Sequence, residues 1–355
     1  MKRIPILYLL PVLVFFAGCG EDYYTVDDFL SVEKIDTHVH IDTPHPIMVE
    51  QAIQDNFRLS LVNRDNPAIP FRYQREVAID LKNQYPDEVS FLTTFTMEGW
   101  EDPDWVENTI DYLEDSFSKG AIGVKIWKNI GMVEKDENGE FIMVDHPQLD
   151  PIFEYLAENG KPVLGHIGEP KNCWLPLEEM TVNNDRDYFE NNPQYHMYLH
   201  PEYPSYEEII EARNNMLDKH PDLVFIGAHL ASLEWSVEEM SEHLDKYPNL
   251  ALDMAHRVSH LQYLTQQDRE KVRDFFIKYQ DRFVYSTDLA HREGEDPVEV
   301  QQLVRDTWRA DWEFFVTDNT LEVWQVDGAF QGLKLPKVVV DKLFRINPET
   351  WYPGI

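Results

Sequence analysis

The sequence predicts an α/β protein with one parallel-sheet domain, expected as a (β/α)8 TIM barrel, and two observations lead to this prediction. Eight short apolar runs of strand length alternate with amphipathic runs of helix length. Strands that alternate with helices form parallel sheets. No Gly/Ser-rich or Pro-rich linker divides the 355 residues, so we expect a single domain over residues 32–355. Periodicity alone leaves an open, doubly wound sheet as the alternative to a closed barrel.

The predicted strands and helices follow one another through most of the chain. The strands are expected at residues 33–38, 57–62, 89–95, 121–127, 162–166, 223–229, 250–254 and 283–287. Helical patterns are clearest at residues 105–118, 206–219, 236–247 and 266–279, and further helices are expected at 297–315 and 336–344. Many of the helices end at a Gly- or Pro-containing pair such as Lys119-Gly120 or His220-Pro221, which supports these boundaries.

Two insertions depart from this alternation. Residues 129–145 contain the turn sequence Asp136-Glu137-Asn138-Gly139, which predicts a hairpin. Residues 167–205 follow the fifth strand, are rich in aromatic residues and Asn, and show no clear period. A loop of this length in a compact domain usually serves a function, so we expect a lid after strand five.

Residues 1–19 resemble the signal peptide of a bacterial lipoprotein. A basic start precedes the apolar run at residues 4–16, which is too short to span a bilayer, and Phe16-Ala17-Gly18-Cys19 resembles a lipobox. We therefore expect export, a lipid on Cys19 that anchors the chain to a bacterial membrane on its periplasmic or outer face, and a tether at residues 20–31. An ordinary secretory signal is the alternative. Cys173 is the only other cysteine, so no intramolecular disulfide could then form.

The charge of the chain excludes one class of partner. The sequence has 65 acidic and 31 basic residues, and its formal net charge is −34. Nucleic-acid binding requires basic surface that displaces counterions from phosphates, so we expect no nucleic-acid partner. A small-molecule substrate and, through the lipid, a membrane remain the expected partners.

Histidine and aspartate residues end several of the predicted strands. Two residues apart on a strand, His38 and His40 point to the same face. His166, His229 and Asp288 end the fifth, sixth and eighth strands. The carboxyl ends of parallel strands meet at one edge, where the chemistry of such proteins lies. These five side chains together therefore predict a metal site.

The order of these residues, with Lys125 in the fourth strand, resembles the amidohydrolase superfamily. The closer resemblance is to its amidohydrolase-related branch, which includes decarboxylases and lactonases besides hydrolases. It extends from Ile35 to the C-terminus, and Gly123 to Lys128 and Asp253 to Arg257 also resemble segments of that branch. The resemblance implies a TIM barrel, one or two divalent ions of the zinc type, and a monomer or homodimer.

The residues and the resemblance together suggest roles for the site. A cation held by His38, His40, His166 and Asp288 would keep one position open for water. Asp288 could accept the proton of that water. His229 would either bind a second ion or donate a hydrogen bond that stabilises the developing oxyanion. Lys125 would be a ligand only if carboxylated, as in two-metal members of the superfamily. As a free ammonium it would pair with a substrate carboxylate or a nearby acid.

Further candidates surround this set. Arg257, Trp127 and Glu169 are candidates for substrate binding, and for Arg257 a structural salt bridge is the alternative. If the fourth strand extends that far, strand alternation predicts that Lys128 faces a different way from Lys125. Cys173 is a weaker candidate for a nucleophile.

The sequence thus favours a metal-dependent hydrolase that cleaves a small ester, lactone or amide. One alternative is a metal-dependent, non-oxidative decarboxylase of a small carboxylic acid. A catalytically inactive, lipid-anchored binding protein is the other alternative, although Asp288 and both histidines of the pair are present.

Overall fold

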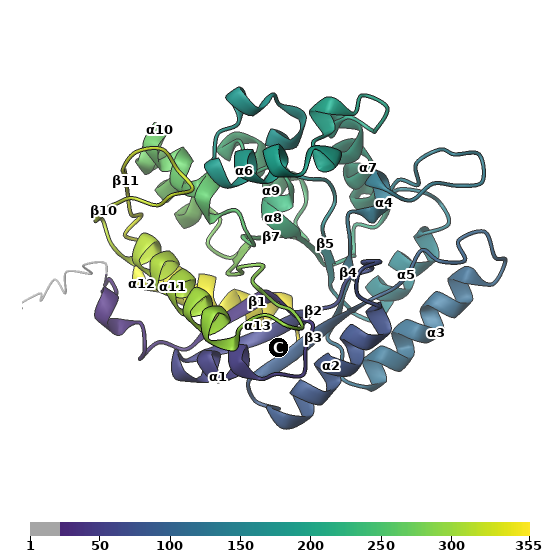
Figure 1. Cartoon of the computed structure of the whole chain (residues 1–355), viewed down its shortest axis with the longest axis horizontal. Coiled ribbons are helices and arrows are strands. Elements are labelled where there is room, and N and C mark those ends of the chain that lie inside the picture. The colour runs from purple at the N-terminus through teal and green to yellow at the C-terminus, as the bar shows by residue number, and fades with distance from the viewer. Residues whose placement is uncertain (1–21) are drawn as a thin grey trace, which may run out of the picture.

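The computed structural model describes residues 22–355 as parallel strands surrounded by helices (Figure 1). The predicted signal peptide and lipobox, with Cys19, lie outside these residues. The strands are β1 Lys34–Ile41, β2 Phe57–Val62, β3 Val89–Thr94, β4 Gly123–Ile126, β5 Val163–Gly165, β6 Phe225–Gly227, β7 Leu250–Asp253, β8 Phe283–Val284 and β9 Ala290–His291. Each pairs in parallel with its neighbours in the order β8-β7-β6-β5-β4-β3-β2-β1-β9.

The sheet closes into a barrel where the chain after β8 meets β1. The backbone N of Thr37 donates to O of Tyr285 (3.1 Å), and N of Asp288 donates to O of His38 (2.8 Å). β9 then pairs with the end of β1. This closure confirms the (β/α)8 barrel and excludes the open sheet.

The strands form because their residues are apolar on both faces. Nearly every strand residue is buried, as expected for parallel strands covered by helices outside and packed side chains inside. Leu92, Leu164, Ile226 and Val284 belong to one buried cluster with Tyr352, which comes from the C-terminal segment. A larger cluster lies between the strands and the helices. The core is thus closed at one end, which leaves the carboxyl ends of the strands, the mouth of the barrel, as the place for a site.

Most predicted helices occur with nearly the predicted bounds. They are α3 Trp105–Ser118, α7 Tyr206–Lys219, α9 Val237–Lys246, α10 Val258–Lys278 and α11 Pro297–Val316. The chain forms three further helices that were not predicted, α1 Ile47–Gln54, α2 Phe71–Gln84 and α5 Asp150–Glu158. The prediction for α10 was wrong at its start, which lies eight residues before residue 266. Asp268 has φ −159° and ψ 93°, so the helix is broken there, and only its second half shows a regular period. Among residues 22–355, no helix combines the length and apolar character needed to cross a membrane.

The two insertions fold into short elements. Around the predicted turn, a single antiparallel bridge joins Lys135 to Phe141, and α4 Asn129–Met132 precedes it. The insert at residues 167–205 contains 3-10 turns and one helix, α6 Asn183–Asn191. The C-terminal segment forms α12 Lys337–Asp341, a π-helical turn at Lys342–Ile346 and α13 Asn347–Trp351.

The N-terminal residues described by the structure lie against the barrel, although a free tether was expected there. A 3-10 turn at Val26–Asp28 leads to Phe29, which is buried against Phe57 and Trp312. The hydroxyl of Tyr24 donates to Asp341 (2.7 Å). Burial of these aromatic rings outweighs the entropy of a free chain, so the segment is part of the domain.

Candidate metal centre

The structure brings the polar residues of four predicted strand ends together at the mouth. Nε2 of His40 lies 3.0 Å from Oδ1 of Asp288, and Nε2 of His38 lies 3.4 Å from the same oxygen. Nζ of Lys125 lies 3.3 Å from Nε2 of His38. His38, His229 and Asp288 each offer one ligand atom, and these atoms lie within 4.8 Å of one another. We call this group of His38, His40, His229 and Asp288 the metal centre.

The three histidines of the metal centre are held in one tautomer. Each contacts, through Nδ1, an oxygen that can only accept a hydrogen bond, so Nδ1 carries the hydrogen and Nε2 carries a lone pair. The acceptors are Oδ2 of Asp253 for His38 (2.8 Å), O of Val62 for His40 (2.7 Å) and O of Ala255 for His229 (2.7 Å). Histidine ligands of metal ions are fixed in the same way by a second partner.

A cation resolves a contact that is otherwise unfavourable. Nε2 of His40 and Oδ1 of Asp288 are both acceptors, yet they lie 3.0 Å apart, with His40 buried and Asp288 only partly exposed. Bonds of about 2.0–2.2 Å from nitrogen and oxygen ligands to a divalent ion would separate neighbouring ligand atoms by about 3.0–3.5 Å. The separations of 3.0 and 3.4 Å to Asp288 fall in this range. The donor set therefore fits a divalent cation.

The charges of these groups suit ligands that bind without a proton. Burial lowers the pKa of His40 to about 4, and the charge of Arg64 adds to this effect. Burial also holds the pKa of His229 well below its usual value. For Asp288, burial acts to raise the pKa, but the contact with His40 and the neighbouring histidines outweigh it and hold the pKa well below the usual range. At neutral pH the site thus offers lone pairs and a negative charge.

Lys125 lies inside the barrel next to His38. Its side chain is buried, and burial lowers its pKa to about 8, against the opposing effect of Asp253 and Asp288. A neutral amine is therefore accessible near physiological pH. Both states that the sequence left open, a modified ligand and a free amine, stay predictions.

Asp253 is the functional residue that the sequence analysis did not assign. At the end of β7, its Oδ2 accepts from His38, and its Oδ1 accepts from the backbone N of His229 (3.1 Å) and of Ala255 (2.7 Å). Burial acts to raise its pKa, but His38 outweighs this and the pKa falls to about 2. One ionised carboxylate thus orients two histidines of the metal centre. Its position at a strand end was the signal available in the sequence.

The backbone that carries His229 is held in an uncommon conformation. His229 to Ser232 have φ between 56° and 58°, the left-handed region that costs energy for residues other than glycine. Gly227 precedes this turn, and a Cβ there would lie 2.4 Å from Cβ of Ala231. Asp288 also has a positive φ, 65°. Left-handed residues in this number cluster where a site requires a particular side-chain direction.

His166 reaches the metal centre only through His229. Its Nδ1 lies 3.1 Å from Nε2 of His229, and the two ring centroids are 4.1 Å apart. Its Nε2 has no hydrogen-bond partner among the described residues and lies 3.8 Å from Oε2 of Glu169. The role of His166 as a ligand stays a prediction.

Lys128 was expected to face a different way from Lys125 only if the strand extended that far, and this condition is not met. β4 ends at Ile126, so strand alternation does not extend to Lys128. Its ammonium instead forms an ion pair with Glu169, which lies beside His166. Burial acts to lower the pKa of Lys128, but Glu169 outweighs it and raises the pKa.

The remaining candidates from the sequence are Arg257, Trp127 and Cys173, and none of them belongs to the metal centre. Nη1 of Arg257 donates to O of His256 (3.0 Å), while its buried Nε has no hydrogen-bond partner among residues 22–355. Trp127 directly follows β4 and is partly exposed. Cys173 is buried, its Sγ donates to O of Tyr195, and burial raises its pKa, which disfavours a nucleophilic thiolate.

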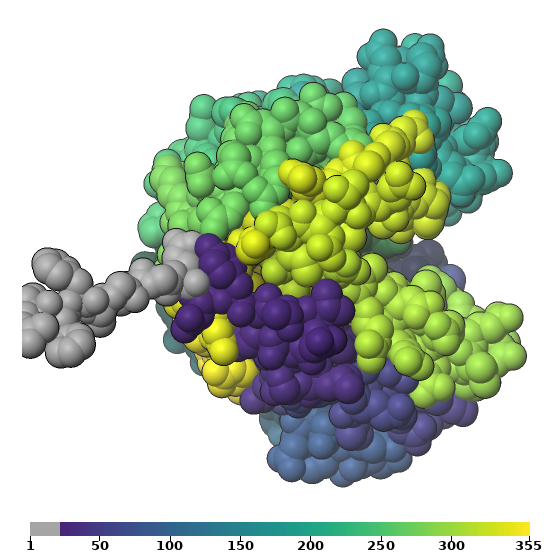
Figure 2. Space-filling model, turned by 90° about the vertical axis from the view of Figure 1, so that its left-hand side faces the viewer, coloured from purple at the N-terminus to yellow at the C-terminus, as the bar shows by residue number. Residues whose placement is uncertain are grey.

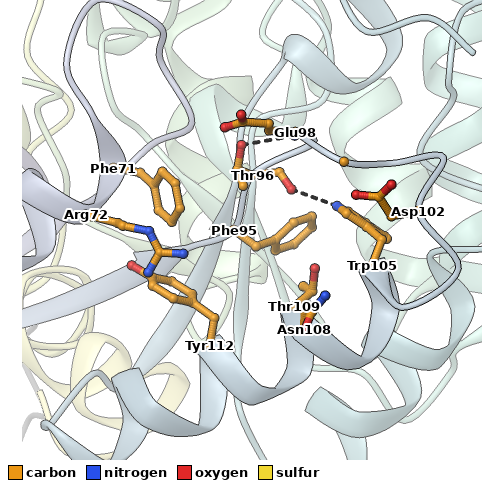
Figure 3. Close-up of a pocket in the computed structure, with 11 residues that line it drawn as sticks. Phe71, Arg72, Phe95, Thr96, Glu98, Asp102, Trp105, Asn108, Thr109 and Tyr112 are labelled. Carbon is orange, nitrogen blue, oxygen red and sulfur yellow. Dashed lines mark hydrogen bonds between the residues drawn. The ribbon is translucent and has the colours of Figure 1, made fainter.

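A hollow beside the end of β3 is separate from the metal centre. It has a volume of about 220 Å³ and lies between residues of α2 and α3 (Figure 3). Phe95 lies at its middle, with Arg72 on one side and Asp102 on the other (Figure 3). No residue of the metal centre lines it.

Solved structures share the fold of this chain. An uncharacterised TIM-barrel protein from Bordetella bronchiseptica is 13% identical with a TM-score of 0.51, and the match covers 91% of this chain and 99% of the other. A 2,6-dihydroxybenzoate decarboxylase from Rhizobium is 14% identical with a TM-score of 0.50, and the match covers 90% and 98%. These identities show a common fold alone. A comparison with curated proteins finds no match. The model of the amidohydrolase family matches residues 35–354, and the chain therefore belongs to that family.

Proposed function

We propose that this protein is a metal-dependent hydrolase that cleaves a small ester, lactone or amide. The contact between Nε2 of His40 and Oδ1 of Asp288 carries the proposal, because two acceptors 3.0 Å apart call for a cation between them. A divalent cation would polarise a carbonyl group and make a water acidic near neutral pH. Imidazole and carboxylate ligands suit zinc, which we propose as the metal.

The residues of the chain divide the remaining work. Asp288 is ionised, so it can accept a proton from a water and pass it to the leaving group. Asp253 fixes the ring of His38 and the backbone of His229. The Nδ1 hydrogen of His229 is engaged by Ala255, so its Nε2 carries a lone pair that either a metal ion or Nδ1 of His166 can take, and a neutral His229 cannot donate to an oxyanion. This geometry favours the ligand role of His229 over the alternative of a hydrogen-bond donor.

One observation favours decarboxylation as the second candidate. After burial, the charges of Lys125 and Lys128 are the next causes that hold the pKa of His166 well below its usual value, and Arg257 adds to them. Lys128 is already paired with Glu169, so Lys125 and Arg257 are the cations that would attract a substrate carboxylate. The related fold from Rhizobium is named as a decarboxylase, which agrees with this alternative.

Turnover by the metal-replete protein separates the two reactions. We would measure metal content first, and then hydrolysis of a panel of esters, lactones and amides beside CO2 release from hydroxybenzoic acids. The hydrolase proposal expects turnover in the first panel and its loss after chelation. Release of CO2 with no turnover of any ester, lactone or amide would replace it with the decarboxylase. Asp288→Asn should abolish either reaction without unfolding the protein.

We also propose that the chain is exported and anchored through a lipid on Cys19. The support is the sequence of residues 1–19 alone. Expression with a radiolabelled fatty acid should label the wild type and not Cys19→Ser. Equal release of both proteins from membranes by salt would contradict the anchor.

A further inference from the structure

A groove lies between α10 and α11, beside the mouth of the barrel. Its volume is about 510 Å³, which is within the range of roughly 300–1,000 Å³ of small-molecule sites. The residues of α11 that line it lie on one face of the helix and include Leu303, Thr307 and Ala310. Val323, Trp324 and Gln325 cover it from the tip of a hairpin formed by β10 Thr320–Leu321 and β11 Phe330–Gln331.

One end of this groove lies near the metal centre. Thr287 lines the groove and immediately precedes Asp288 in the chain. His256 also lines it, and the backbone N of His256 donates to O of Thr287 (3.1 Å). The groove therefore ends one residue along the chain from Asp288, and no residue of the metal centre itself lines it.

The groove exposes apolar side chains from a firmly held backbone. Trp324 is 65% exposed and Leu303 is 53% exposed. The hairpin tip is tied to the insert, because Asn183 donates through Nδ2 to O of Trp324 (2.9 Å) and through N to O of Gln325 (2.8 Å). Figure 2 shows the hairpin meeting the insert at the surface. Because the backbone is held in this way, the indole of Trp324 stays exposed to water, which is unfavourable in free energy. A bound apolar group would cover the indole and remove this unfavourable exposure.

The charge of the groove defines the kind of ligand. Its lining contains no lysine or arginine. Asp306 accepts two hydrogen bonds from Gln302, and Asp311 accepts one from Tyr285. The lining thus offers no cation for an anionic ligand, and the carboxyl groups of Asp306 and Asp311 already accept hydrogen bonds, which favours an uncharged ligand over a charged one.

We propose that the groove binds an uncharged, apolar part of the substrate, an alkyl chain or an aryl ring, whose reacting group lies at the metal centre. The proposal rests on the proposed function for the position of the reacting group. It narrows the substrate class to molecules with an apolar extension of several carbons. Trp324 and Leu303 are then specificity-determining residues.

A series of n-alkyl hydroxamic acids, from acetohydroxamic to decanohydroxamic acid, tests this proposal on the metal-replete protein. The head group chelates the metal, and each added methylene should tighten binding about fourfold while the chain fills the groove. Trp324→Ala and Leu303→Ser should flatten this increase and leave the affinity for acetohydroxamic acid unchanged. Val298→Ser is the matched control, because Val298 is 71% exposed on the same helix but does not line the groove. Affinities that do not rise with chain length in the wild type would overturn the proposal.

A probe that needs no metal separates this proposal from the proposed function. N-phenyl-1-naphthylamine is uncharged and fluoresces in apolar sites. We expect it to bind to wild type and to Val298→Ser, and to bind at least tenfold more weakly to Trp324→Ala. If acetohydroxamic acid does not bind but this probe behaves as expected, the proposed metal centre is contradicted and the proposed ligand site in the groove is supported. Equal binding of the probe to wild type and Trp324→Ala would overturn the groove, whatever the hydroxamic acids do.

Discussion

β1 carries a buried base near each of its ends, and the two bases differ in whether the protein supplies their hydrogen-bond partners. At the first residue, Nζ of Lys34 donates to O of Phe29 (2.5 Å) and O of Val32 (2.6 Å), and lies 4.7 Å from the ring centroid of Phe57. Near the last residue, Nε2 of His40 faces another acceptor, Oδ1 of Asp288. The ammonium of Lys34 is satisfied by the protein, whereas the lone pair of His40 is not.

This difference separates structural from functional polar groups in one strand. A buried polar group with a full set of partners serves the fold, because leaving it unpaired would cost free energy. A group of acceptors that face one another needs a ligand from outside the chain. We therefore expect changes at Lys34 to alter stability alone, and changes at the metal centre to alter metal binding and turnover.

The largest effect is expected for His38→Ala. The variant loses a ligand, so its metal content should fall and kcat/KM should drop by at least about 1,000-fold, since a metal supplies several kcal/mol of transition-state stabilisation. Metal analysis and steady-state kinetics measure both. His200→Ala is the control, because His200 lies in the insert and bonds to O of Pro193. Full metal content with full activity in His38→Ala would contradict the assignment of the site.

A smaller effect is expected for Asp253→Asn. The amide can still accept from His38 but no longer carries the charge that fixes its tautomer, so metal affinity should fall about 10- to 100-fold. Competition with a chelator measures the change. Asp311→Asn removes another buried carboxyl, which accepts from Tyr285, and should leave the affinity within about twofold of wild type. Equal losses in both variants would show that any buried carboxyl has this effect.

The strand ends could be predicted from the sequence because two simple rules apply there. Alternation along a strand places His38 and His40 on one face, and parallel strands bring their carboxyl ends to one edge. Asp253 follows the same rules, but its role depends on a contact with His38, 215 residues away in the chain. No local sequence pattern predicts that these two side chains meet.

Other parts of the site depend on where regular structure stops. Strand alternation could not give the direction of Lys128, because β4 ends two residues before it. The break at Asp268 hid the first half of α10, which lines the groove. The hairpin tip with Trp324 reaches the insert through Asn183, 141 residues away in the chain, so only the folded structure brings the two together.

The stability of the metal-free protein should depend on pH through His40. Burial lowers its pKa to about 4 from 6.5, so the unfolded chain binds more protons between these values. Stability from the neutral ring is complete above pH 6.5 and is lost as the pH falls towards 4, with a loss of about 2 kcal/mol at pH 5. Urea unfolding of chelated protein at pH 7.5 and 5 should show this loss in wild type and a smaller one in His40→Asn. Equal losses of stability in wild type and His40→Asn would contradict the assignment of this pH dependence to His40.

The smallest effect is expected for Lys34→Met, and it should appear in stability alone. Methionine keeps the apolar stem beside Phe57, but the carbonyl groups of Phe29 and Val32 lose their donor, so unfolding should become easier by about 1 kcal/mol. Burial lowers the pKa of Lys34 to about 7, so wild type gains stability as the pH rises from 7 towards 10.5, and the variant lacks this gain. The difference between the two proteins should therefore grow over that range in urea unfolding. Metal affinity should not change, because Lys34 lies at the end of β1 opposite to His40. A tenfold loss of metal affinity in this variant would remove the distinction between the two ends of the strand.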